Sequence, residues 1–126
     1  MLKKIYKDNP NVIYLPNAGE YEHFSTSNEN LLSKYKKPII GYFGAISDWF
    51  DTSLIEFTAQ SKPNWTFVLI GHTFGSDIRK LQKLPNVYFL GERPYSELPK
   101  YLVDFDVCLI PFVSNSLIEA THPVKI

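Results

Sequence analysis

The stretch PIIGYFG at residues 38–44 decides the fold that this sequence predicts. It is a short run of mostly apolar residues between a proline and a glycine, and such unbroken apolar character is typical of a strand covered on both faces of a sheet. Similar runs recur along the chain, namely NVIYLP (11–16), WTFVLIG (65–71), NVYFLG (86–91) and VCLIPF (107–112). Each of these runs is therefore predicted to be a strand.

The segments between the later runs have the spacing of amphipathic helices. In TSLIEFTAQSK (52–62), Ser53 and Glu56 fit a capping box at the start of a helix. Two further segments, SDIRKLQKL (76–84) and ELPKYLVDF (97–105), place apolar residues at helical spacing. Strands and helices thus alternate, which predicts an α/β fold: a Rossmann-like parallel sheet with helices on both faces and right-handed crossovers.

Composition limits the classes of function. A chain of 126 residues that is 44% apolar can build one packed domain. Its 13 basic residues balance 13 acidic ones, so no net charge favours nucleic acid or an anionic membrane as a partner. The single cysteine, Cys108, lies in an apolar run and is predicted to be a small buried side chain. The sequence shows neither a membrane-span pattern nor a signal-peptide pattern, and a cytoplasmic location is expected.

The loops that follow the predicted strands mark the expected binding edge. In an open parallel sheet, ligands bind beyond the carboxyl ends of the strands, where the strand order reverses. The loops at that edge are GAISDWFD (44–51), GHTFGSD (71–77), GERPYSE (91–97) and PFVSNSLIEATHPVK (111–125). Three of them begin with a glycine, which lets a backbone approach a ligand closely. Their repetition at one edge favours a ligand site there.

Several common motifs are absent from the sequence. No third glycine completes a dinucleotide fingerprint after Gly41 and Gly44, and no GxxxxGK[ST] phosphate loop occurs. The histidines lie in different loops without a metal-binding partner at ligand spacing, which argues against a zinc site; they are His23, His72 and His122. No GxSxG nucleophile elbow occurs. We therefore expect neither a metal nor a bound cofactor.

Longer stretches of the chain carry a family pattern. They are NVIYLPNAGEYEHF (11–24), PIIGYFGAIS (38–47), WTFVLIG (65–71) and NVYFLGERPYSELPKYLVDFDVCLIPF (86–112), with Asn115, Leu117, Ala120, Pro123 and Lys125 in the last loop. Together they resemble the carboxyl-terminal, donor-binding domain of a retaining GT-B glycosyltransferase (group 1, family 4-like) of the bacterial cell-envelope polysaccharide type. The resemblance implies one half of a GT-B fold, incomplete at the carboxyl end. Residues 1–37 would be a lead-in or crossover segment, and residues 38–126 a truncated nucleotide-sugar-binding domain.

The resemblance also implies a donor site and leaves the catalytic residues unknown. Its residues would be Gly44, Ala45, Gly91, Glu92, Arg93, Asn115, Ser116, Leu117, Thr121, His122 and Lys125. Gly44 and Ala45, with the Ile46 backbone, would face the donor diphosphate, and residues 91–93 would contact the nucleobase. Residues 115–117 would contact sugar or phosphate. Thr121 and His122 would lie near the diphosphate, and Lys125 would neutralise its charge. Where many members carry an Arg and a Lys after the first strand, this chain has AISDWFD (45–51). The role of Glu119 stays open.

The activity implied is transfer of a sugar from a nucleotide diphosphate sugar to a hydroxyl in cell-surface polysaccharide synthesis. The partners would be the nucleotide sugar and an amino-terminal acceptor domain that this chain lacks, with peripheral membrane association only through the full-length enzyme. The isolated chain is then expected to be inactive, and self-association is a further expectation. Two alternatives stay open: a flavodoxin-like or receiver-like module with Asp48 and Asp51 at the strand end, and an interaction domain that exposes Trp49 and Phe50.

Overall fold

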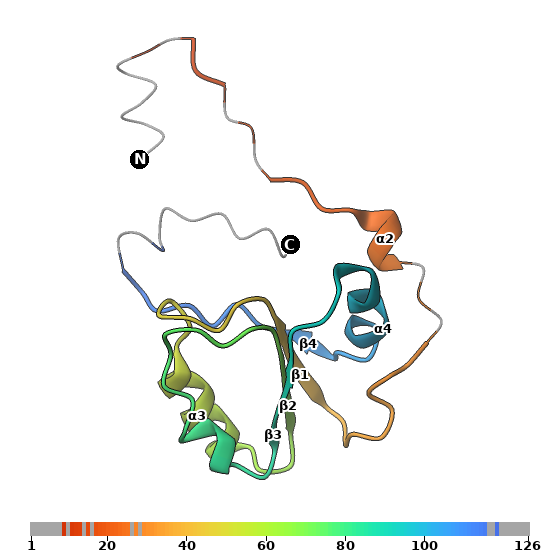
Figure 1. Cartoon of the computed structure of the whole chain (residues 1–126), viewed down its shortest axis with the longest axis vertical. Coiled ribbons are helices and arrows are strands. Elements are labelled where there is room, and N and C mark those ends of the chain that lie inside the picture. Colours follow the sequence, from red (N-terminus) through yellow and green to blue (C-terminus); the bar gives the residue numbers. More distant parts are fainter. Residues whose placement is uncertain are drawn as a thin grey trace. The chain divides into compact units, whose positions relative to one another are not determined.

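The protein is described from a computed structural model, in two compact units. The description covers residues 9, 11–13, 15, 17–25, 27, 29–115 and 118. One unit, here called the sheet unit, is Tyr21–Val113, and the other combines Met1–Glu20 with Ser114–Ile126. Of the part of the chain that the structure describes, every helix and strand with named bounds lies in the sheet unit (Figure 1). The boundary predicted between residues 37 and 38 stays a prediction.

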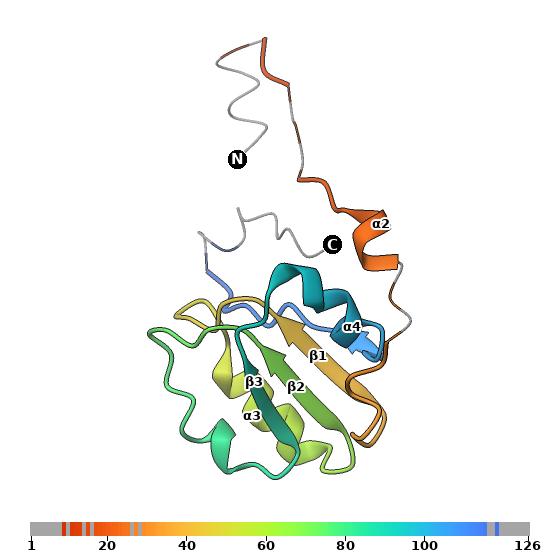
Figure 2. The ribbon, with the colours of Figure 1, turned by 45° about the vertical axis from the view of Figure 1, so that its right-hand side comes forward.

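Within the described residues, four parallel strands form the sheet, in the order β3-β2-β1-β4 (Figure 2). They are β1 (Ile39–Phe43), β2 (Thr66–Ile70), β3 (Val87–Gly91) and β4 (Val107–Cys108). β1 lies between β2 and β4, as in a Rossmann half, whereas in a flavodoxin-like sheet the first strand lies between the second and the third. The predicted fold class is confirmed, and the order of these four strands does not support the flavodoxin-like or receiver-like alternative.

Helices cover both faces of this sheet (Figure 2). On one face, α3 (Thr52–Ser61) buries Ile55 and Ala59 against side chains of β1 and β2. On the other face, α4 (Leu98–Leu102) buries Leu98 in a second cluster. Successive side chains of a strand point to opposite faces, so Tyr42 joins the first cluster and Ile39 the second. Coverage on both faces explains why the apolar runs are continuous.

The start of α3 differs from the prediction. The N-cap is Asp51, whose Oδ1 accepts a hydrogen bond from the Leu54 backbone N at 2.9 Å. The capping box expected from Ser53 and Glu56 is therefore wrong, because the helix already begins at Thr52 and Ser53 lies in its first turn. A carboxylate at this position accepts a hydrogen bond from a free backbone amide, and its negative charge interacts favourably with the positive end of the helix dipole.

The helix predicted over 76–84 is also wrong in its extent. The segment contains only one short 3₁₀ turn, η1 (Leu81–Lys83), before the chain enters β3. Leu84 is extended (φ −83°, ψ 128°), as expected for a residue that precedes a proline. The apolar side chains of Ile78, Leu81 and Leu84 still pack together in the cluster beneath α3.

Two other predictions are wrong: the strand over 11–16 and the burial of Cys108. Among the described residues, no helix or strand covers either segment. In the run 11–16, the described residues form no strand, and Ile13 and Leu15 are 87% and 88% exposed. In the run 107–112, β4 covers only two residues, both of them exposed, so the prediction of a buried Cys108 is wrong. Within the described part of the chain β4 is an edge strand that pairs with β1 alone.

Two carboxylates that follow α4 connect the sheet to the segment before it. Asp104 is buried, and its Oδ2 accepts a hydrogen bond from the Leu32 backbone N at 2.7 Å. Asp106 Oδ2 accepts from the Ile39 backbone N at 2.7 Å, while its Oδ1 pairs with Lys37 Nζ at 3.0 Å. These contacts fix the entry into β1.

Asp106 gives a testable dependence of stability on pH. The hydrogen bond from Ile39 N, followed by that from Lys37, holds the pKa of this carboxyl below its usual 3.8. A lowered pKa means that the carboxylate stabilises the fold above the unfolded-state pKa, and that this stabilisation is lost as the pH falls below it. The difference in free energy of unfolding between wild type and Asp106→Asn should therefore shrink from about pH 6 to about pH 3. Urea unfolding across that range measures it, and a difference independent of pH would contradict the assignment.

Candidate nucleotide-binding site

A depression lies at the carboxyl ends of β1, β2 and β3. It has a volume of about 160 Å³ and is lined by Phe43, Gly44, Ala45, Ile70, Gly71, His72, Glu92, Arg93 and Leu98. We call it the strand-end depression. Because the chain runs outward from β1 to β3 on one side and returns to β4 on the other, the strand order reverses next to β1, and the depression lies at the edge predicted to bind a ligand. Typical small-molecule sites occupy about 300–1,000 Å³, so it has room for part of a nucleotide.

The structure brings together four of the residues that the sequence assigned to a donor site. Gly44 and Ala45 come from the loop after β1, and Glu92 and Arg93 from the loop after β3. Gly91 directly precedes the second pair, ends β3 and has a positive φ of 71°. Their shared position is established by the geometry, and their role in binding stays a prediction.

Backbone pairing continues past the ends of β1 and β2 and uses two of the three amides expected to face phosphate. Gly44 N donates to Ile70 O at 2.8 Å, and Ile46 N donates to His72 O at 2.9 Å. Ala45 N has no hydrogen-bond partner among the described residues. Of these three amides, Ala45 N is therefore the one still able to donate to an anion.

Gly71, the residue that follows β2, has no room for a side chain. Its φ is +149°, and a Cβ built on it would lie 1.9 Å from the carbonyl oxygen of Gly44. Its backbone N also donates to Gly91 O at 2.8 Å. Two backbones thus meet at the base of the strand-end depression without a side chain between them.

The basic side chains that line the depression are Arg93 and His72. Arg93 is exposed, and its Cζ lies 5.8 Å from the centre of the Tyr101 ring. The loop after β1 is acidic instead: Asp48 is exposed and Asp51 caps α3. From the sequence, His72 is considered only as a metal ligand, but in the structure it lines the depression. Its position directly after the glycine that ends β2 was the available signal.

The other predicted site residues are not part of this depression as described. Asn115 belongs to the second unit, where its Oδ1 accepts a hydrogen bond from the Ile118 backbone N at 2.9 Å. The remaining ones lie outside the described residues: Ser116, Leu117, Thr121, His122 and Lys125, as does Glu119.

The exposed aromatic pair expected in the loop after β1 is only half correct. Trp49 is 37% exposed, but Phe50 is buried at 3%, with its ring edge-on to Tyr42 at 4.9 Å between centres. The prediction for Phe50 is wrong because this residue packs into the core beneath α3.

Within the described ranges, no three His, Cys, Asp or Glu side chains are grouped so that they could hold a metal ion. None of the described helices has the length and apolar character to cross a membrane.

Comparison with known proteins yields one relative and one solved structure of note. Over 98% of its length, the chain is 28% identical to the "Putative teichuronic acid biosynthesis glycosyltransferase TuaH" of Bacillus subtilis (strain 168). The chain is a homologue of a bacterial glycosyltransferase. It spans about a third (33%) of the length of TuaH.

The solved structure is that of Anabaena HepE in complex with UDP and glucose. It superposes with a TM-score of 0.46 and 21% identity, over 58% of this chain and 22% of HepE. No protein-family model matches the chain.

Proposed function

We propose that the sheet unit binds the nucleoside diphosphate part of a nucleotide-sugar donor, as a portion of a glycosyltransferase of cell-surface polysaccharide synthesis. The observation that carries this proposal is the strand-end depression, where Gly44, Ala45, Glu92 and Arg93 meet at the reversal of a Rossmann-type strand order. The homology to TuaH, which is named for teichuronic acid biosynthesis, supports the polysaccharide class.

The lining of the depression suits the parts of such a ligand. Phe43, Ile70 and Leu98 offer an apolar wall for a base or ribose, and the Glu92–Arg93 segment offers polar groups at its rim. In sugar transfer, the bond between the sugar and the diphosphate breaks, and the nucleoside diphosphate leaves with added negative charge. The acceptor oxygen forms the new bond to the sugar and releases its proton, so the products are the glycoside, the nucleoside diphosphate and one proton. Arg93, His72 and the amide of Ala45 would stabilise the departing charge.

This proposal involves no metal ion or other cofactor. A depression of about 160 Å³ holds only part of a donor, so the remaining donor contacts and the acceptor site would come from outside the sheet unit. The isolated chain is then proposed to bind nucleotide without transferring sugar.

A nucleotide-binding measurement tests this function. The full chain is titrated with UDP, GDP, ADP, CDP and dTDP by ligand-observed NMR, in wild type and in Arg93→Ala. We expect one nucleotide to bind selectively and Arg93→Ala to weaken it about tenfold, because a charge-assisted hydrogen bond is lost.

Arg79→Ala is the matched control, since Arg79 is also exposed but pairs with Asp77 at 2.7 Å and does not line the depression. It removes the same charge and should leave the affinity unchanged. The proposal fails if none of the five nucleotides binds, or if both arginine variants weaken binding equally.

A further inference from the structure

The two charged residues that line the depression, Glu92 and Arg93, lie in a short exposed segment held at both ends. Before it, Gly91 O accepts a hydrogen bond from Gly71 N at 2.8 Å. After it, the Tyr95 carbonyl oxygen lies 3.1 Å from Nε2 of His23. The first contact is part of the sheet, but the second comes from a helix 72 residues earlier in the chain.

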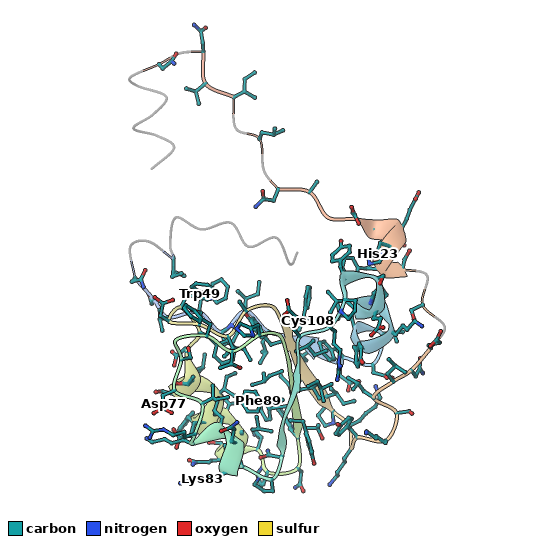
Figure 3. All side chains as sticks on the ribbon, viewed as in Figure 1. His23, Trp49, Asp77, Lys83, Phe89 and Cys108 are labelled. Carbon is teal, nitrogen blue, oxygen red and sulfur yellow. The ribbon has the colours of Figure 1, made fainter. Side chains whose placement is uncertain are left out.

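That helix is α2 (Tyr21–Ser25), which contacts α4 within the sheet unit (Figure 3). The His23 ring stacks on the Tyr95 ring with 4.6 Å between centres and 10° between planes. Phe24 meets the Tyr95 ring edge-on at 5.6 Å. A carbonyl oxygen can only accept, so Nε2 of His23 donates the hydrogen bond. His23 thus contacts Tyr95 twice, by stacking on its ring and by donating a hydrogen bond to its carbonyl oxygen.

The same cluster extends to the wall of the depression. Phe24 lies 6.2 Å from Phe43 between ring centres, and both pack in the cluster that contains Leu98. Phe43 and Leu98 line the depression, whereas no residue of α2 does. α2 therefore touches the elements that shape the site without being part of its surface.

We propose that α2 is a positioning element of this site: His23 and Phe24 hold Tyr95, and Tyr95 fixes the Glu92–Arg93 segment that faces the ligand. This inference rests on the proposed nucleotide-binding function for its ligand, but the geometry on which it depends is that of the chain alone. Free-energy coupling is reciprocal, so a nucleotide that orders the segment also stabilises the docking of α2.

The first test uses the chain without ligand. Heteronuclear ¹⁵N NOE values are measured for the amides of Glu92, Arg93 and Tyr95 in wild type, His23→Ala and Tyr21→Ala, because these values report backbone motion on the picosecond to nanosecond timescale. Tyr21 is the control, since it lies on the same helix and is 83% exposed. We expect the values to fall in His23→Ala and to stay unchanged in Tyr21→Ala. Equal values in all three proteins would overturn the proposal.

The second test measures affinity for the same five nucleoside diphosphates. His23→Ala should weaken the nucleotide that wild type binds by about fivefold, and Tyr21→Ala should not. His23→Phe keeps a stacked ring but removes the hydrogen-bond donor, so its nucleotide affinity should lie between those of wild type and His23→Ala. If His23→Ala does not fold, the affinity of His23→Phe tests the proposal in its place. Binding that is unaffected in every His23 variant overturns the positioning role and leaves the nucleotide site standing. If the NOE values fall in His23→Ala but the wild-type chain binds no nucleotide, the contact of His23 with Tyr95 does order the segment, and the proposed nucleotide-binding function is overturned.

Discussion

Gly71→Ala is expected to lower the free energy of unfolding by about 3 kcal/mol or more. The added Cβ would lie 1.9 Å from the carbonyl oxygen of Gly44, and that oxygen belongs to a backbone that cannot swing aside as a side chain could. A φ of +149° adds strain for any residue with a Cβ. The loops after β1 and β2 would have to separate, and the strand-end depression would lose its base.

Thermal and urea unfolding measure this effect, and Gly91→Ala is the matched control. Gly91 also has a positive φ of 71°, but a Cβ there would meet no atom within 4 Å. It should cost only the conformational strain, about 1 kcal/mol. Similar losses in both variants would show that strain at positive φ, rather than the contact with Gly44, determines the choice of glycine at residue 71.

Gly41→Ala is expected to give the second large loss, about 2–3 kcal/mol. Gly41 is buried in the middle of β1, and a Cβ on it would lie 2.0 Å from Cε2 of Phe105, inside the aromatic ring's own volume. The ring packs in the cluster beside α4 and would have to leave it. The lost packing and the displaced ring both contribute to the loss.

A double-mutant cycle separates this steric effect from the strand preference of the residue. Phe105→Ala removes the ring, and Gly41→Ala in that background should be neutral or stabilising by about 0.5 kcal/mol, because alanine loses less backbone entropy than glycine. Urea unfolding of the four proteins measures the coupling. Additive losses would mean that Phe105 is not what excludes a side chain at residue 41.

The secondary structure could be predicted from the sequence in part, and the failures have local causes. Four of the five predicted strands form, three of them over five residues and the fourth, β4, over two. The helix over 76–84 shrinks to one 3₁₀ turn at Leu81–Lys83, and Pro85 explains why that turn ends at the extended Leu84. A strand over 11–16 is absent at the described positions, since a strand requires a partner that the run itself cannot specify.

The site was predictable in its location but not in its contacts. Glycines after successive strands indicate the binding edge, and four of the residues named there do meet in one depression. Which amides are already used depends on the pairing of Gly44 and Ile46 with the neighbouring loop. The position of His72 directly after Gly71 puts it at the binding edge, but only the structure shows that it lines the depression.

The sequence by itself determined the order of strands and helices, the apolar faces, and the edge at which a ligand site was expected, because these depend on residue type and spacing within short windows. The tertiary structure alone decided the strand order β3-β2-β1-β4, the close contact that requires Gly71, the burial of Phe50 and the grip of His23 on Tyr95. These features arise from contacts between residues far apart in the chain, and the energy of such a contact is a property of neither residue alone.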